Sequence, residues 1–237
     1  MTALERPPAY GPARGGGRRP CAEPLVCPFV RALELRDERT GTHSRRMSRL
    51  AGLIAWRLGL GEERSDAIRL TCLLHDIGKI GVPDRILLKP GPLTKAQRAV
   101  VEQHPLMGYN LLAGTGSPLL DAAAAVALTH HERFDGYPRR LARFQIPLEG
   151  RIATVADVFD ALVSDQPYRP RLSLDEAVTT IRRGSGSRFD PEMTAVFLES
   201  LNDALLLYED SECGARRSGR TATQPALDSA AGEGVLW

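Results

Sequence analysis

The residues best suited to chemistry in this 237-residue chain are its five histidines and the aspartates near them. His75 and Asp76 are adjacent, and Lys79 follows three residues after the aspartate. An imidazole beside a carboxylate is costly to bury unless the two are paired or bound to metal. Together they suit a metal site in which the aspartate bridges two cations. The alternative interpretation of HDIGKIGVPDRILLKPG is a helix C-terminus followed by a turn.

All the histidines lie near an expected helix end or on an inward helix face: they are His43, His75, His104, His130 and His131. His43 shares the apolar face of an expected helix with Met47 and Leu50. With Asp157 on another helix, these side chains could bind Mn, Fe or Zn. The alternative is five unrelated histidines, because adjacent ones share a site only if their helix frays there. Taken together, the residues favour a hydrolytic metal centre.

The composition indicates one globular domain with little net charge. Apolar residues make up 43% of the chain and the net charge is +2, which gives no reason to expect a nucleic-acid polymer as partner. The four cysteines form no CxxC pair, so we expect a reduced, cytoplasmic protein without disulfides. No apolar run approaches the roughly 18 residues that a membrane span needs, so we expect no membrane association.

The hydrophobic periodicity predicts an all-α fold: a single helical domain at 28–207 between disordered tails at 1–27 and 208–237. Helices are expected at about 29–38, 42–58, 62–77, 94–104, 106–113, 119–131, 148–162, 174–182 and 191–207. Capping boxes at Thr94 and Ser173 fix two of the helix starts. Ser117 and Asp190, each followed by proline, fix two more.

Several motifs, in this order, resemble those of the HD-GYP domain, a branch of the HD metal-dependent phosphohydrolases. They are TGTHSRRM (40–47), HDIGKIGVPDRILLKPGPLT (75–94), the HP of QHPLMGYNLL (103–112), HHERFDGYP (130–138), IPLEGRIATVADVFDAL (146–162), PYRP (167–170) and RFDPEM (188–193). The resemblance covers about Asp37 to Leu198. It implies an all-helical HD-type domain that hydrolyses cyclic di-GMP, a bacterial second messenger, to linear pGpG, to GMP, or to both in turn.

The resemblance also implies a set of site residues. Two divalent ions (Fe, Mn or Zn) would be held by His43, His75, Asp76, His104, His130, His131 and Asp157. Cations bridged by Asp76 would clamp a phosphodiester and lower the pKa of a bound water. Lys79 would neutralise a phosphate oxygen or protonate the leaving oxygen; its alternative role is a solvent-exposed cation at a helix C-terminus. Substrate contacts are expected from Lys79, Arg133, Tyr137 and Arg169.

Three departures from the family pattern affect these expectations. Arg39 stands where some members have a glutamate that binds a third metal, so we expect two ions. The loop HHERFDGYP is two residues shorter than the usual HHERWDGSGYP and must follow a tighter path. Gln166 replaces an arginine that grips substrate phosphate, a loss of about 1.5–3 kcal/mol in binding that Arg169 could offset in part. Arg133 could equally be a surface cation.

Three functions remain open from the sequence. The first is a cyclic di-GMP phosphodiesterase. The second is the same chemistry on another cyclic dinucleotide or nucleotide, and the third is a metal-holding module with a binding or scaffold role and weak turnover. Family members usually carry an N-terminal sensory or receiver domain, whereas about 27 residues precede the helices here. We therefore expect a separate sensory or receiver chain or a diguanylate cyclase as partner, or a homodimer formed through the helix at 29–38.

Overall fold

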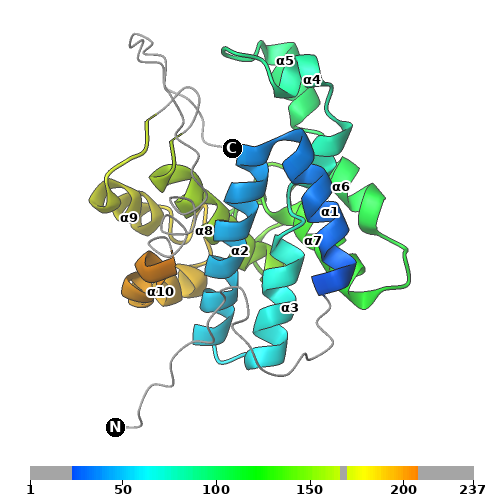
Figure 1. Ribbon diagram of the computed structural model, residues 1–237. Helices are drawn as coiled ribbons and strands as arrows, with labels where there is room; N and C mark the ends of the chain where they lie inside the picture. Colours follow the sequence, from blue (N-terminus) through cyan, green and yellow to red (C-terminus); the bar gives the residue numbers. More distant parts are fainter. Residues whose placement is uncertain (1–22, 166–169, 208–237) are drawn as a thin grey trace, which may run out of the picture.

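The computed structural model describes residues 23–165 and 170–207, which form a bundle of helices (Figure 1). The first half contains α1 (Glu23–Arg36), α2 (Glu38–Arg57), α3 (Glu62–Cys72), the 3₁₀ helix η1 (Ile77–Gly81), α4 (Asp84–Leu87), α5 (Lys95–Val101) and α6 (His104–Leu112). The second half contains α7 (Pro118–Thr129), η2 (Arg143–Gln145), α8 (Leu148–Val163), α9 (Leu174–Arg183) and α10 (Pro191–Glu199). Among the described residues no strand forms, and Ser185 and Phe189 make one isolated bridge. The predicted all-α class is confirmed.

Two apolar clusters hold the bundle together. The larger one joins α2 and α8 to α9 and α10, and includes Phe159 and Phe197, whose ring centroids are 4.7 Å apart. The smaller one joins α1 and α3 to α7, through residues such as Val30 and Leu74. Helix α2 lies near the middle of the bundle, between α1 and α3 on one side and α8 to α10 on the other (Figure 1). Helices α2 and α8 of the larger cluster, and the segments that follow α3 and α7 of the smaller one, carry residues of the site described below.

The predicted helix starts are confirmed where local capping specifies them. Thr94 and Gln97 form a reciprocal capping box at α5, and Ser173 and Glu176 form another at α9. The side chain of Asp190 accepts a hydrogen bond from the backbone N–H of Glu192 at the start of α10. Such caps satisfy backbone donors that no helical carbonyl can reach, so they fix a helix start independently of the rest of the fold.

The first helix begins earlier than the sequence predicted. It starts at Glu23 instead of about residue 29, so residues 23–27 of the expected N-terminal tail belong to α1. Pro28 lies inside this helix and removes one backbone donor. Its ring is exposed, while Val26 and Val30 on the opposite face are buried in the smaller cluster. Burial of that face offsets the missing hydrogen bond.

Further helix ends differ from the prediction, and those next to His75 and His104 matter for the site. The helix expected at 62–77 ends at Cys72, after which hydrogen bonds to the third preceding residue tighten the chain through His75 into η1. His104 begins α6 instead of ending the preceding helix, because Pro105 suits the first turn of a helix, where no backbone donor is needed. The last expected helix, 191–207, is interrupted at Ser200 and continues at 201–207.

A close backbone approach sets η1 against α6. A Cβ atom at Gly78 would lie 1.9 Å from the carbonyl oxygen of His104 and 2.4 Å from the backbone nitrogen of Gly108. Only glycine therefore allows the two segments to meet at this distance. The contact fixes the residues just before η1 relative to the start of α6. Among the described residues, no helix has the length and apolar character required to cross a bilayer.

We predict that Gly78→Ala lowers the free energy of unfolding by about 1–3 kcal/mol, because the added methyl group meets backbone that cannot move aside. Gly81→Ala is the matched control in the same 3₁₀ helix. Its Cβ would meet the flexible thioether of Met107, so we expect a change within about 1 kcal/mol. Urea unfolding followed by circular dichroism measures both. Equal losses in the two variants would contradict the assigned role of the η1–α6 contact.

Candidate metal centre

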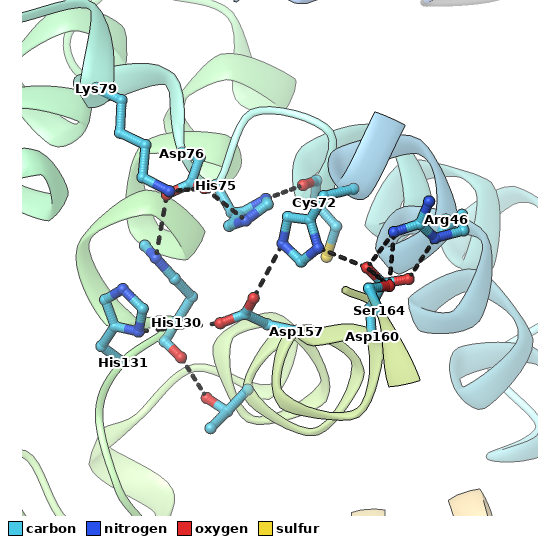
Figure 2. Close-up of polar contacts among 12 residues, drawn as sticks. Arg46, Cys72, His75, Asp76, Lys79, His130, His131, Asp157, Asp160 and Ser164 are labelled. Carbon is cyan, nitrogen blue, oxygen red and sulfur yellow. Dashed lines mark hydrogen bonds and ion pairs between the residues drawn. The ribbon is translucent and has the colours of Figure 1, made fainter. Parts of the chain in front are cut away.

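The structure brings together all seven side chains that the sequence marked as candidate metal ligands. They come from five separate segments: His43 from α2, His75 and Asp76 from the turn after α3, His104 from the start of α6, His130 and His131 from the residues after α7, and Asp157 from α8. Figure 2 shows the labelled members of this set facing one another. Segments more than 110 residues apart in the chain thus meet at one place.

The candidate ligands fall into two groups with Asp76 between them. The nitrogens of His104, His130 and His131 could contact one ion, and atoms of His43, His75 and Asp157 could contact another; within each group the atoms lie within 4.8 Å of one another. The Oδ1 atom of Asp76 is 3.2 Å from His104 Nε2, and its Oδ2 atom is 3.3 Å from His75 Nε2. One carboxylate oxygen therefore faces each group, as a bridging ligand requires.

Backbone carbonyls fix the tautomers of three of the histidines. Nδ1 of His75 lies 2.9 Å from the carbonyl oxygen of Cys72, Nδ1 of His104 lies 2.7 Å from that of Val101, and Nδ1 of His130 lies 2.9 Å from that of Ala127. A carbonyl oxygen can only accept, so each Nδ1 carries the proton and donates it. In the neutral rings, each Nε2 then presents a lone pair to the centre, which is how a second hydrogen bond prepares a histidine to bind metal.

This arrangement leaves more acceptors than donors in a buried space. Nε2 of His104 and Nε2 of His130 are 3.3 Å apart, and in these tautomers neither has a proton to share. His75 Nε2 is buried and makes no hydrogen bond, although Asp76 is close. Burial lowers the pKa values of His130 and His131 well below the ordinary value, with neighbouring histidines adding to the shift, so both rings are neutral at pH 7. Clustered lone pairs of this kind fit divalent cations.

Lys79 supplies positive charge at the edge of the cluster. Its Nζ atom is 2.5 Å from Asp76 Oδ2, and a quarter of its side chain is exposed (Figure 2). Burial acts to lower the pKa of Lys79, but the Asp76 carboxylate raises it above the ordinary value. Burial acts to raise the pKa of Asp76, but the Lys79 ammonium holds it well below its usual range. The lysine is therefore a fixed ammonium beside an ionised carboxylate.

His43 is held differently from the other histidines. Its Nε2 atom is 3.0 Å from Asp157 Oδ1, and its Nδ1 atom is 2.7 Å from Asp160 Oδ2. Burial acts to lower its pKa, but the two carboxylates raise the pKa of His43 to about 10. Asp160 was not among the residues singled out from the sequence. The available signal was a carboxylate on the inward face of α8, three residues after Asp157, where burial requires a partner.

The end of α7 places His130 and His131 in one site. The helix ends at Thr129, and the rings of the two histidines that follow lie with their centroids 3.9 Å apart. The carbonyl of His130 accepts a hydrogen bond of 2.9 Å from Thr154 Oγ1 on α8. Gly150 lets α8 approach, since a Cβ there would lie 2.3 Å from Thr129 Oγ1. The condition set by the sequence, a helix that ends at this pair, is met.

The loop after His131 carries two of the predicted substrate contacts. It is closed by hydrogen bonds from Arg133 N to the carbonyl of Tyr137 (2.7 Å) and from Asp135 N to the carbonyl of Ser187 (2.8 Å). Tyr137 is 61% exposed. The Arg133 guanidinium is paired with the Asp135 carboxylate at 2.5 Å. Gln166 and Arg169 lie outside the described residues, and so do Cys21 and Cys213.

Comparisons with known proteins give the chain a family. It is 42% identical over 206 residues to a cyclic di-GMP phosphodiesterase of Thermotoga maritima, covering 85% of this chain and 55% of that protein. It is 46% identical over 172 residues to the cyclic di-GMP phosphodiesterase response regulator RpfG of Xanthomonas campestris, covering 72% and 46%.

A third relative, the 3'3'-cGAMP-specific phosphodiesterase 2 of Vibrio cholerae, is 34% identical over 191 residues, covering 80% of this chain and 37% of that protein. The chain thus spans about half the length, or less, of these relatives. Residues 29–193 match the family model of the HD domain. That match covers most of the chain and includes the whole histidine–aspartate cluster, so this chain belongs to the HD domain family.

Proposed function

We propose that the chain is a metal-dependent phosphodiesterase that hydrolyses cyclic di-GMP to linear pGpG, GMP or both. The single observation that carries this proposal is the position of Asp76, with one oxygen toward each of two ligand groups. Two divalent ions (Fe, Mn or Zn) would be held there by His43, His75, Asp76, His104, His130, His131 and Asp157. When bound, such ions polarise a phosphodiester and acidify a water molecule.

The chain's own residues have distinct roles in this proposal. Asp76 holds the two ligand groups in a fixed relation, and Lys79 keeps an ammonium next to it, where it can neutralise a phosphate oxygen or protonate the leaving oxygen. Tyr137 presents an exposed ring on the loop that follows His131, where a substrate base or phosphate can contact it. The Arg133 guanidinium is paired with Asp135, so it can bind a phosphate only after leaving that carboxylate. Arg169 is a second candidate cation.

The relatives support cyclic di-GMP as the first substrate to test. The two at 42% and 46% identity are named cyclic di-GMP phosphodiesterases, whereas the one named 3'3'-cGAMP-specific is 34% identical. A second cyclic dinucleotide is the alternative, favoured by Gln166 and by the shortened loop closed between Arg133 and Tyr137. A weakly active binding or scaffold module is the remaining alternative. A scaffold role alone does not explain why so many candidate metal ligands surround the buried Asp76 carboxylate.

Location and partners follow from the same proposal. Cys72 is a buried free thiol, which supports a reducing, cytoplasmic environment. We propose that the input comes from a sensory or receiver domain or a diguanylate cyclase on a separate chain, or through a homodimer. Helix α1 is the element at which such an input would act, since Arg36 on it donates hydrogen bonds to the carbonyls of Ile80 and Val82, next to Lys79.

The first test is metal content and turnover together. Protein purified without air should contain about two divalent ions per chain and hydrolyse cyclic di-GMP, and Asp76→Ala should lose both properties. At a metal concentration 100 times the dissociation constant, each bound ion should stabilise the parent by about 2.7 kcal/mol, which thermal unfolding with and without a chelator detects. A parent that binds no metal under these conditions would rule out the proposed function.

The role of Lys79 is tested separately from metal binding. Lys79→Ala should reduce turnover by about 10²–10³-fold, because it removes one positively charged donor aimed at the reacting phosphate, while the metal content stays at the parental value. Lys89→Ala is the control, since its ammonium donates to the carbonyl of Pro92 and to Gln97 Oε1 at the start of α5, and Lys89 is not among the candidate ligands. Steady-state kinetics with elemental analysis distinguishes the two. Unchanged turnover in Lys79→Ala would remove the lysine from the mechanism.

A substrate panel decides between the two dinucleotide hypotheses. We expect kcat/KM to be highest for cyclic di-GMP when it is compared with 3'3'-cGAMP and cyclic di-AMP at equal metal loading. Restoring the missing cation with Gln166→Arg should raise the affinity for cyclic di-GMP, by about 10-fold or more if the lost contact is worth about 1.5–3 kcal/mol. A parental preference for 3'3'-cGAMP would move the assignment to the alternative.

A further inference from the structure

A buried ion-pair network lies behind His43, on the side away from the metal centre. Asp160 on α8 is 0% exposed. Arg46 on α2 donates two hydrogen bonds to its carboxylate, from Nε to Oδ1 at 2.8 Å and from Nη2 to Oδ2 at 2.9 Å. The same Nη2 atom donates to Ser164 Oγ at 2.8 Å. Figure 2 shows Asp160, Arg46 and Ser164 together at the side of the view opposite to His130 and His131. The network joins α2 to α8 one helical turn beyond the His43–Asp157 contact.

Asp160 is not itself a metal ligand in this arrangement. Its Oδ1 atom accepts from Arg46 Nε, and its Oδ2 atom accepts from His43 Nδ1 and Arg46 Nη2. Both oxygens are occupied by donors, and the carboxylate is absent from the two groups of side chains that could hold an ion. Its remaining contact with the centre is through the His43 ring, whose other nitrogen faces Asp157.

We infer that Asp160 and Arg46 are positioning residues that hold the His43 ring so that its Nε2 atom is directed at the metal subsite of His75 and Asp157. This inference rests on the proposed metal centre. The carboxylate accepts the Nδ1 proton, so that when Nε2 loses its proton on metal binding the ring is left as the tautomer whose Nε2 lone pair ligates the ion. Arg46 fixes the carboxylate in a bidentate fork, and that geometry is lost if the guanidinium is replaced by an ammonium.

His43 depends on Asp160 because no backbone carbonyl in its own segment accepts its Nδ1 proton. The other three histidines with an assigned tautomer donate to a carbonyl three residues earlier in their own segment. His43 lies within α2, where backbone carbonyls bond within the helix, and its Nδ1 partner is a side chain 117 residues away. Removing the partner should therefore disturb one metal subsite and leave the other intact.

The test measures Mn²⁺ binding directly. Chelator-treated protein is titrated with Mn²⁺, and free Mn²⁺ is followed by its electron paramagnetic resonance signal. We expect the parent to bind two ions, and Asp160→Asn to bind one as the parent does and the other about 10–100-fold more weakly. Arg46→Lys, which keeps the charge, should weaken the same ion and carries the test if Asp160→Asn does not fold. In the background of Asp160→Asn, His43→Ala should cost little further affinity.

Asp190→Asn is the matched control. Asp190 is also a buried carboxylate paired with an arginine, Arg151 on α8, at 2.5 Å, and among the described residues neither member of this pair belongs to the two groups of candidate ligands. The variant should lose stability in urea unfolding, as Asp160→Asn does, yet bind both Mn²⁺ ions with parental affinity.

The outcomes separate the inference from the function on which it rests. A parent that binds no Mn²⁺ contradicts the proposed metal centre itself. A parent that binds two ions, with Asp160→Asn and Arg46→Lys binding them equally well, overturns the positioning role alone. An equal loss of Mn²⁺ affinity in Asp190→Asn also overturns it, since the effect would then follow from general loss of a buried ion pair.

Discussion

A carboxylate taken out of water must be surrounded by donors or cations, and Asp76 places this requirement at the centre of the fold. Its Oδ2 atom accepts a hydrogen bond from the Lys79 ammonium in η1. The lone-pair nitrogens of His75, from the turn after α3, and of His104, at the start of α6, also face this carboxylate, and a cation between them would complete its surroundings. Leaving such a charge without partners costs several kcal/mol. The segments that supply partners must therefore lie close together, and the contact of η1 with α6 at Gly78 is what makes this approach possible.

The protein atoms of the cluster include more buried hydrogen-bond acceptors than donors, and this excess indicates what the cluster can bind. The lone pairs of His75, His104 and His130 converge with the oxygens of Asp76, and Lys79 supplies one nearby ammonium. In an ordinary core the excess of acceptors would be removed by substitution or satisfied by donors. Here three backbone contacts hold the rings with their acceptors inward, so the protein maintains a geometry that a cation can complete.

Much of the fold and of the site could be predicted from the sequence, because the signals were local or strongly periodic. The capping residues Thr94, Ser173 and Asp190 start their helices as predicted, since a cap depends only on residues a few positions away. The end of α3 at Cys72 was missed, because the turn that follows it leads into η1, where Gly78 packs against His104, 26 residues further along the chain. Asp160 was missed for a similar reason: its partners lie on α2, and nothing near it in sequence reveals them.

The hydrogen bonds that orient the histidines divide the centre into two parts with different tolerance to mutation. The carbonyls of Cys72, Val101 and Ala127 are present whatever side chains those positions carry, so the rings they hold keep their orientation through many substitutions. His43 depends instead on the side chain of Asp160, and through it on Arg46, either of which a single base change can remove. A lineage that loses the metal centre would be expected to lose it first at His43.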